Sequence, residues 1–205
     1  MPKRGYHHGN LRQALIDAAL ELIEARGPMG FTLSEAAKQA GVTPAAVYRH
    51  FEGREDLIAE AALQGYEIFA DLMEYAYEKG QPSALAAFSA TGRAYLAFAR
   101  KYPGHYIAMF ESGISINRTP ELAAVANRAS GVLEKAATGL SQHIPEDKRP
   151  PASMFSAHIW ALSHGVVELF ARNSPGRASP FPPDDLLETG IGIYLRGLGL
   201  INPDE

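Results

Sequence analysis

The sequence predicts an all-α fold, and three observations lead to this prediction. Apolar residues recur three and four positions apart along most of the 205 residues. No stretch alternates between apolar and polar residues as a half-buried strand does, and glycines and prolines fall between the periodic stretches, where helices end. We therefore expect separate helices, in a chain long enough to bury a sizeable core.

Two amphipathic helices are expected at the start of the chain. Residues 10–26 carry apolar side chains on one face, and a Gly-Pro pair follows them. Thr32 then lies three residues before Glu35, which is the capping-box spacing for the start of a second, short helix. Phe31 is expected to fill the gap between the two helices.

A glycine turn and a third helix follow the second one. Gly41 can adopt the positive φ that ends a helix, and Thr43 can cap the next helix, with Pro44 at its first position. The spacing predicts a helix of about two turns, with Val47 and Phe51 directed to the core. Its other face carries small residues and then Tyr, Arg and His. Small side chains let a backbone approach base edges, and the longer ones can reach phosphates.

These features predict a helix-turn-helix that binds double-stranded DNA. Arg54 is expected in the first turn of the next helix, where its side chain and free N–H groups can meet a phosphate. Lys3, Arg4 and Arg12 are unopposed by acids in the first twelve residues, and this arm either contacts DNA or is merely solvated. The predicted DNA-binding residues are Lys3, Arg4, Thr32, Thr43, Pro44, Ala45, Ala46, Tyr48, Arg49, His50 and Arg54.

The formal net charge of −4 does not contradict DNA binding, because it is unevenly distributed. Residues 1–56 contain seven Lys/Arg and seven Asp/Glu, whereas residues 57–205 contain twelve and sixteen. The acidic excess therefore lies outside the predicted helix-turn-helix.

Residues 10–57, including GFTLSEAAKQAGVTPAAVYRHFEGREDL, resemble the DNA-binding domain of TetR-type transcriptional regulators. In that family a Gly-Val-Ser/Thr step precedes a recognition helix that ends in Tyr-x-x-Phe and then Lys-Glu-x-Leu. Arg54 replaces the usual lysine here, and Gly53 the usual Ser or Thr. The Trp-Ala-Leu-Ser-His-Gly stretch at 160–165 and the opening at 6–12 are similar to the WHG subgroup. The resemblance implies a DNA-binding domain over 1–57 and an effector-binding and dimerisation domain over 58–205.

The rest of the chain is predicted to be helical. A long helix is expected from Arg54 to about Glu78, and further helical stretches are expected over 83–101, 103–110, 120–140, 152–172 and 184–200. The last two stretches carry little charge for their length, so a second copy of the chain is needed to bury them. A homodimer through the last two helices follows, as the family resemblance also implies. Gly165, within one of these helices, suggests the close approach of another helix.

Aromatic and methionine side chains along the C-terminal part are candidates for binding a small-molecule effector. Most such side chains are ordinary core, and His164 is either a ligand contact or a hydrogen-bonded core histidine. The predicted ligand-binding residues are Tyr66, Phe69, Met73, Phe88, Tyr95, Phe110, Trp160 and His164.

Several functional classes are not predicted. No cysteine is present, and His164 and Glu168 stand at metal-ligand spacing without a visible third ligand, so no metal or cofactor is expected. No nucleophile elbow or phosphate-binding loop is found, so no catalytic residues are assigned and no enzyme is predicted. The N-terminus lacks the apolar run of a signal peptide and no stretch suits a membrane span, so we expect a cytoplasmic protein.

The sequence thus predicts a homodimeric transcriptional repressor, released from a palindromic operator by a small apolar or amphipathic effector. The alternative is an all-α small-molecule carrier or enzyme with no DNA role. A nucleoid-type DNA binder without an effector is a third possibility.

Overall fold

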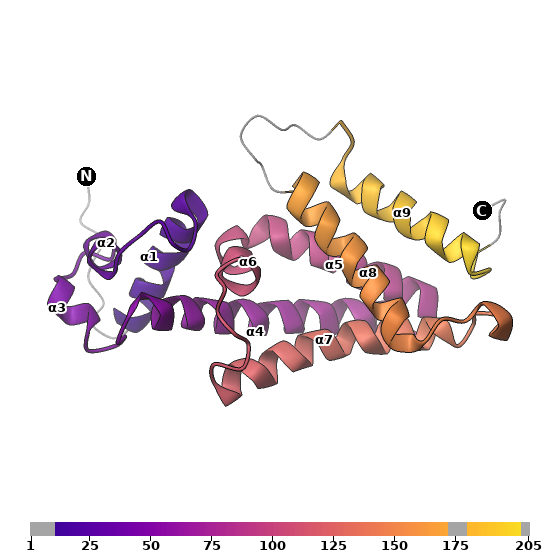
Figure 1. Cartoon of the computed structure of the whole chain (residues 1–205), viewed down its shortest axis with the longest axis horizontal. Coiled ribbons are helices and arrows are strands. Elements are labelled where there is room, and N and C mark those ends of the chain that lie inside the picture. Colours follow the sequence, from indigo (N-terminus) through magenta and orange to yellow (C-terminus); the bar gives the residue numbers. More distant parts are fainter. Residues whose placement is uncertain (1–10, 172–179, 202–205) are drawn as a thin grey trace. The chain divides into compact units, whose positions relative to one another are not determined.

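The computed structural model describes residues 11–171 and 180–201 (Figure 1). Helices make up its regular structure and no strand occurs in these residues, which confirms the predicted all-α class. The described residues form two compact units, one of residues 11–66 and 103–123 and the other of residues 67–102, 124–171 and 180–201. Within the described ranges, no helix combines the length and the apolar character that crossing a bilayer requires.

The first unit contains the predicted helix-turn-helix. Its helices are α1 (Leu11–Arg26), α2 (Leu33–Gln39), α3 (Pro44–Val47), the first part of α4 (Arg54–Gly80) and α6 (Pro103–Phe110). Helix α1 packs against α2 and α6. Phe31, before α2, is 2% exposed and belongs to the core of this unit, as predicted.

Glycines allow α6 to lie directly against its neighbours in the first unit. A Cβ atom placed on Gly104 of α6 would lie 2.7 Å from the backbone oxygen of Leu20 in α1. A Cβ atom on Gly65 of α4 would lie 2.7 Å from the sulfur of Met109 in α6. Since real Cβ contacts are longer than this, a side chain at Gly104 would press on the backbone of α1, whereas one at Gly65 would require the Met109 side chain to move.

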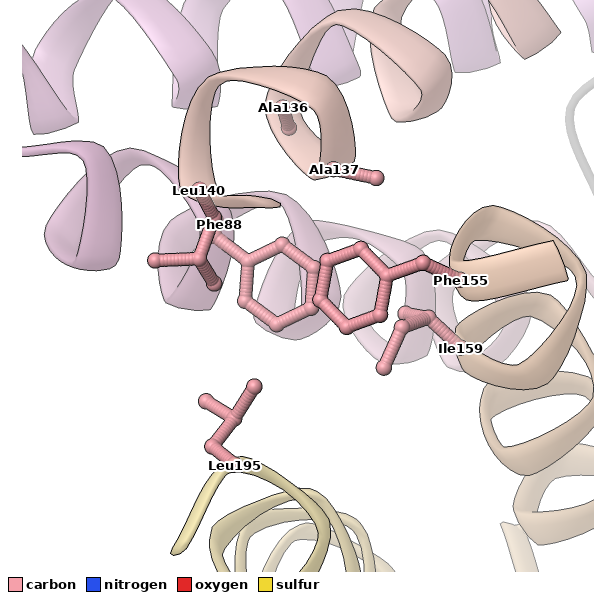
Figure 2. Packing of buried hydrophobic residues seen from close by; sticks show 7 residues of the cluster. All are labelled: Phe88, Ala136, Ala137, Leu140, Phe155, Ile159 and Leu195. Atoms are coloured by element: carbon pink, nitrogen blue, oxygen red, sulfur yellow. The ribbon is translucent and has the colours of Figure 1, made fainter. Parts of the chain in front are cut away.

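The second unit is a bundle built around a cluster of apolar side chains. Its elements are the second part of α4, α5 (Ala84–Lys101), most of α7 (Pro120–Ser141), a 3₁₀ turn (Glu146–Lys148), α8 (Ala152–Val166), a π-helical turn (Val167–Ala171) and α9 (Pro183–Gly197). Figure 2 shows the rings of Phe88 and Phe155 side by side, with Leu140 of α7 on one side and Leu195 of α9 on the other. The two rings are nearly parallel, with centroids 6.0 Å apart.

The structure corrects the end of the helix predicted over 152–172. Regular α-helix ends at Val166, and the chain continues as a π-helical turn from Val167 to Ala171. A Cβ atom on Gly165 would meet nothing within 4 Å. Within the described residues no helix approaches Gly165, so a close approach there by a second copy of the chain stays a prediction.

We predict that Gly104→Ala destabilises the protein by about 1–3 kcal/mol, the usual cost of overpacking a tight contact. The added methyl group would press on the backbone of Leu20, which cannot rotate away as a side chain can. Urea unfolding of the full chain measures the effect. Gly131→Ala on α7 is the control, because open space surrounds that position and the change should stabilise by at most about 1 kcal/mol. Equal effects from the two variants would contradict the packing argument.

Candidate nucleic-acid interface and ligand cleft

Helix α2 begins with the predicted capping box. The Thr32 hydroxyl accepts the backbone N–H of Glu35 at 3.2 Å, and the Glu35 carboxylate accepts the N–H of Thr32 at 2.8 Å. Arg26 of α1 also donates to this carboxylate, at 2.8 Å. The backbone bond from Thr32, then its hydroxyl, then Arg26 hold the pKa of Glu35 below its usual value.

The turn between α2 and α3 follows the predicted geometry. Gly41 has a φ of 75°, which a residue with a side chain rarely adopts. The N–H of Val42 donates to the oxygen of Ala37 at 2.9 Å, and the N–H of Gly41 donates to the oxygen of Lys38 at 3.1 Å. These two bonds form a Schellman motif, which satisfies the last carbonyls of α2 and directs the chain into α3.

Helix α3 is shorter than the two turns predicted. It spans only Pro44–Val47, and the chain then turns further, with the N–H of His50 donating to the oxygen of Val47 at 2.9 Å. Thr43 has the extended backbone of an N-cap, but its side chain makes no capping bond. The prediction of side-chain capping at Thr43 is therefore wrong.

Residues 43–50, which we call the recognition segment, present one face outward and one inward. Val47 is fully buried, and Phe51, just after the segment, is 4% exposed. Tyr48 is 62% exposed. The other exposed members are Thr43, Pro44, Ala45, Arg49 and His50, and Ala46 is half-buried. The predicted outward residues thus lie at the surface, and their contact with DNA stays a prediction.

Arg12 holds the end of the recognition segment in place, and it is not part of a free basic arm as the sequence suggested. Its guanidinium forms an ion pair with Glu60 of α4 at 2.6 Å and lies 4.9 Å from the ring centroid of Phe51. It also donates to the backbone oxygen of His50 at 3.4 Å. Sequence reasoning missed this role, because none of its partners is local to Arg12.

Arg54 also differs from its predicted orientation. Its guanidinium donates to the backbone oxygens of Met29 and Phe31, both at 3.2 Å, between α1 and α2. The carboxylate of Asp56 accepts the N–H of Glu52 at 3.1 Å, so an acid already occupies the start of α4. These contacts give Arg54 a structural role and leave the start of α4 a poor place for a phosphate.

Positive charge remains available beside the recognition segment. Arg118 is neutralised by Glu55 and Asp56. In contrast, Arg49 and Lys38 are exposed and have no ion-pair partner within the described part of the chain. Lys3 and Arg4, also predicted to bind DNA, lie outside the described residues.

The predicted ligand-binding residues do not gather around one cavity. Tyr66 and Phe110 belong to the first unit, where their rings meet edge to face with centroids 5.9 Å apart. Phe69 and Met73 are at most 1% exposed and belong to the packed core of the second unit.

His164 is held among aromatic side chains in the second unit. Its Nδ1 lies 2.9 Å from the hydroxyl of Tyr95, and its ring is nearly parallel to that of Trp160, with centroids 5.9 Å apart. Tyr95 is 1% exposed. This geometry fits the core-histidine alternative.

A cleft of about 210 Å³ lies between α5 and α9 in the second unit. Phe88 is the member of the predicted ligand set that lines it, together with Gly92, Leu187 and Ile191. The sequence signal that marks this cleft is Gly92, a small residue in the middle of an apolar helix. A Cβ atom on Gly92 would lie 3.9 Å from Leu187.

Comparisons with known proteins agree on one family. The sequence model of the tetR family of bacterial regulatory proteins matches residues 15–61, and that of the tetracyclin repressor-like C-terminal domain matches residues 88–194, more than half of the chain. Neither description names the WHG subgroup, which stays a prediction.

Among curated relatives, the uncharacterised HTH-type transcriptional regulator YobS of Bacillus subtilis (strain 168) is 30% identical over 101 residues, 49% of this chain and 51% of YobS. SrpR, an HTH-type transcriptional regulator of Pseudomonas putida, is 49% identical over 47 residues, 23% of this chain and 22% of SrpR. The matched regions thus span about half the length of YobS and less of SrpR.

Solved structures resemble the chain over nearly its whole length. A protein of unknown function from Rhodococcus sp. RHA1 is 26% identical with a TM-score of 0.76, over 96% of this chain and 99% of that one. The TetR family regulator PfmR from Thermus thermophilus is 17% identical with a TM-score of 0.71, over 90% of this chain and 98% of that one. The second likeness shows a shared fold.

We predict that Glu35→Gln reduces the loss of unfolding free energy that occurs as the pH falls into the acid range. Contacts in the folded state lower the pKa of Glu35, so its carboxylate stabilises the fold above the unfolded-chain value of about 4.3, and this stability is lost as the pH falls below it. Glutamine still accepts the capping bond but does not titrate. Urea unfolding between about pH 3 and 6 measures the slope. Glu134→Gln, on the exposed side of α7, controls for the loss of one charge, and an identical effect there would refute the assignment.

Proposed function

Because the chain belongs to the tetR family of bacterial regulatory proteins, we propose that it is a homodimeric transcriptional repressor that leaves a palindromic operator when a small apolar or amphipathic effector binds. The observation that carries the DNA-binding part is the recognition segment. Within the described residues, its exposed side chains Tyr48 and Arg49 form no hydrogen bond or ion pair, whereas Val47 and the following Phe51 are buried.

The recognition segment suits a major groove. Pro44 and Ala45 at its start are small and exposed, so the backbone can come close to base edges and thymine methyl groups. Tyr48, Arg49 and His50 follow and are exposed. In this proposal they bind phosphates on either side of the groove. We also propose DNA contacts for Thr32, Thr43 and Ala46, and for Lys3 and Arg4 on the DNA backbone or in the minor groove.

The outer sides of α8 and α9 support a two-fold dimer. Ile193 of α9 is 65% exposed, and Leu169, in the π-helical turn, is 58% exposed. Gly190 and Gly197 of α9 have open space where a Cβ would be, so a second helix can approach closely there. We propose that this surface packs on its own copy, which would place two recognition segments on successive major grooves about 34–36 Å apart or a multiple of it.

Control by an effector requires only that DNA and the effector bind preferentially to different conformations of the dimer. Helix α4 is continuous from Arg54, just after the recognition segment, to Gly80. A shift of this helix would change the separation of the two recognition segments, and a small error in separation weakens several DNA contacts together. An effector that prefers the non-binding conformation by a few kcal/mol is sufficient.

We predict that Arg49→Ala weakens binding to random-sequence duplex DNA. It should also reduce the magnitude of the slope of log K against log salt concentration by about two, because each of the two subunits loses one phosphate contact. Fluorescence anisotropy over a salt series measures both quantities. Arg93→Ala is the matched control, because it removes one exposed arginine of α5. Absence of any salt-dependent binding by the unaltered chain would favour the carrier or enzyme alternative.

We predict that Ile193→Glu converts the dimer to monomers, because it places two carboxylates in the proposed apolar contact. Sedimentation velocity of the unaltered chain should show twice the mass of one chain, and the variant half of that. Tyr75→Glu on α4 is the control, since Tyr75 is 62% exposed and lies outside α8 and α9. A variant that remains dimeric would place the interface elsewhere.

A further inference from the structure

We propose that the cleft between α5 and α9 is the effector site, and that it takes an uncharged molecule about the size of one benzene ring that carries a hydroxyl group. The regulatory role of the ligand rests on the proposed function, but its binding to the cleft does not. It replaces the dispersed set of aromatic residues that the sequence suggested with a single site in one unit.

The size of the cleft limits its ligand. A cavity of about 150 Å³ holds a benzene molecule, and drug-sized ligands need about 300–1,000 Å³. The volume of about 210 Å³ therefore suits one ring with a short substituent. Phe88, Leu187 and Leu195 form its apolar side, and all three are at most 4% exposed. Figure 2 shows Leu195 on α9 facing the ring of Phe88.

The polar side of the cleft favours a hydroxyl over a charged group. Arg93 and Glu188 both line the cleft, and neither has a partner in the part of the chain that the structure describes. Asp184 also lines it, but Arg100 already binds that carboxylate at 2.5 and 2.9 Å. A guanidinium only donates hydrogen bonds and a carboxylate only accepts them, whereas a hydroxyl does both. A charged ligand would be attracted by one of the two groups and repelled by the other.

The position of the cleft connects a ligand with the proposed dimer surface. Leu187, Ile191 and Leu195 are spaced by four, so they share the side of α9 that faces the cleft. Ile193, exposed, lies on the other side of the same helix. A ligand beneath α9 would therefore move the helix that carries the dimer contact, and with it the spacing of the two subunits.

Binding can be tested on the full chain with benzyl alcohol as the probe. Titration followed by the amide signals of ¹⁵N-labelled protein gives the Kd, and the signals of Gly92 and Gly192, which line the cleft, should shift. We expect Gly92→Leu to raise the Kd about tenfold or more, because the new side chain occupies the space of the ligand. Gly131→Leu, the same change at an exposed position on α7, should leave the Kd unchanged. Benzoate and benzylamine, the charged analogues, should both bind more weakly than benzyl alcohol.

A milder variant keeps the test valid if Gly92→Leu does not fold. Gly92→Ala adds a methyl group at an ordinary contact distance of 3.9 Å from Leu187 and should weaken binding by a smaller factor. An unchanged Kd in the folded Gly92 variants, an equal loss in Gly131→Leu, or tighter binding of a charged analogue would overturn the inference. If benzyl alcohol does not bind while DNA does, the inference fails and the proposed function stands. If benzyl alcohol binds while DNA does not, the proposed function fails and the site stands.

Discussion

Burial of Val47 and Phe51 is the interaction on which the first unit depends. A helix of four residues cannot persist by its own hydrogen bonds, since isolated helices shorter than about 12 residues are marginal in water. Removing two such side chains from water contributes about 1.5–3 kcal/mol each. Together with the Schellman motif before it, this burial fixes which way the recognition segment faces. Arg12 adds a cation over Phe51 and an ion pair to α4, and so closes the segment from its other end.

The second unit places apolar side chains on both sides of its last helix. One side of α9 packs on α5 and α8 and borders the cleft, and the other is exposed. An isolated chain does not cover the exposed side, so α9 has a structural reason to lie between its own bundle and a partner. The bidentate pair of Arg100 and Asp184 joins the end of α5 to the start of α9, and it lowers the pKa of Asp184. The pair thus closes one end of the contact between α5 and α9, and the cleft lies further along the same contact.

The sequence predicted features that depend on neighbouring residues. The capping box of Thr32 and Glu35, the positive φ of Gly41 and the bounds of most helices all follow from spacings of a few positions. It did not predict features set by distant partners. Arg12 and Arg54 look like DNA contacts because arginine often is one. In the structure both are held by carbonyl, carboxylate or ring groups of residues that lie 23 to 48 positions away in the sequence. The cleft was missed for the same reason, because no spacing within α5 or α9 tells how the two helices meet.

The recognition segment separates the residues that fold it from those that are exposed. The side chains of Tyr48 and Arg49 are exposed and form no hydrogen bond, ion pair or ring contact in the described residues, whereas those of Val47 and Phe51 are buried. Outward positions can therefore be exchanged during evolution, or in the laboratory, with little cost in stability. Under the proposed function, a scaffold of this kind can be retargeted to a new base sequence while its architecture is retained.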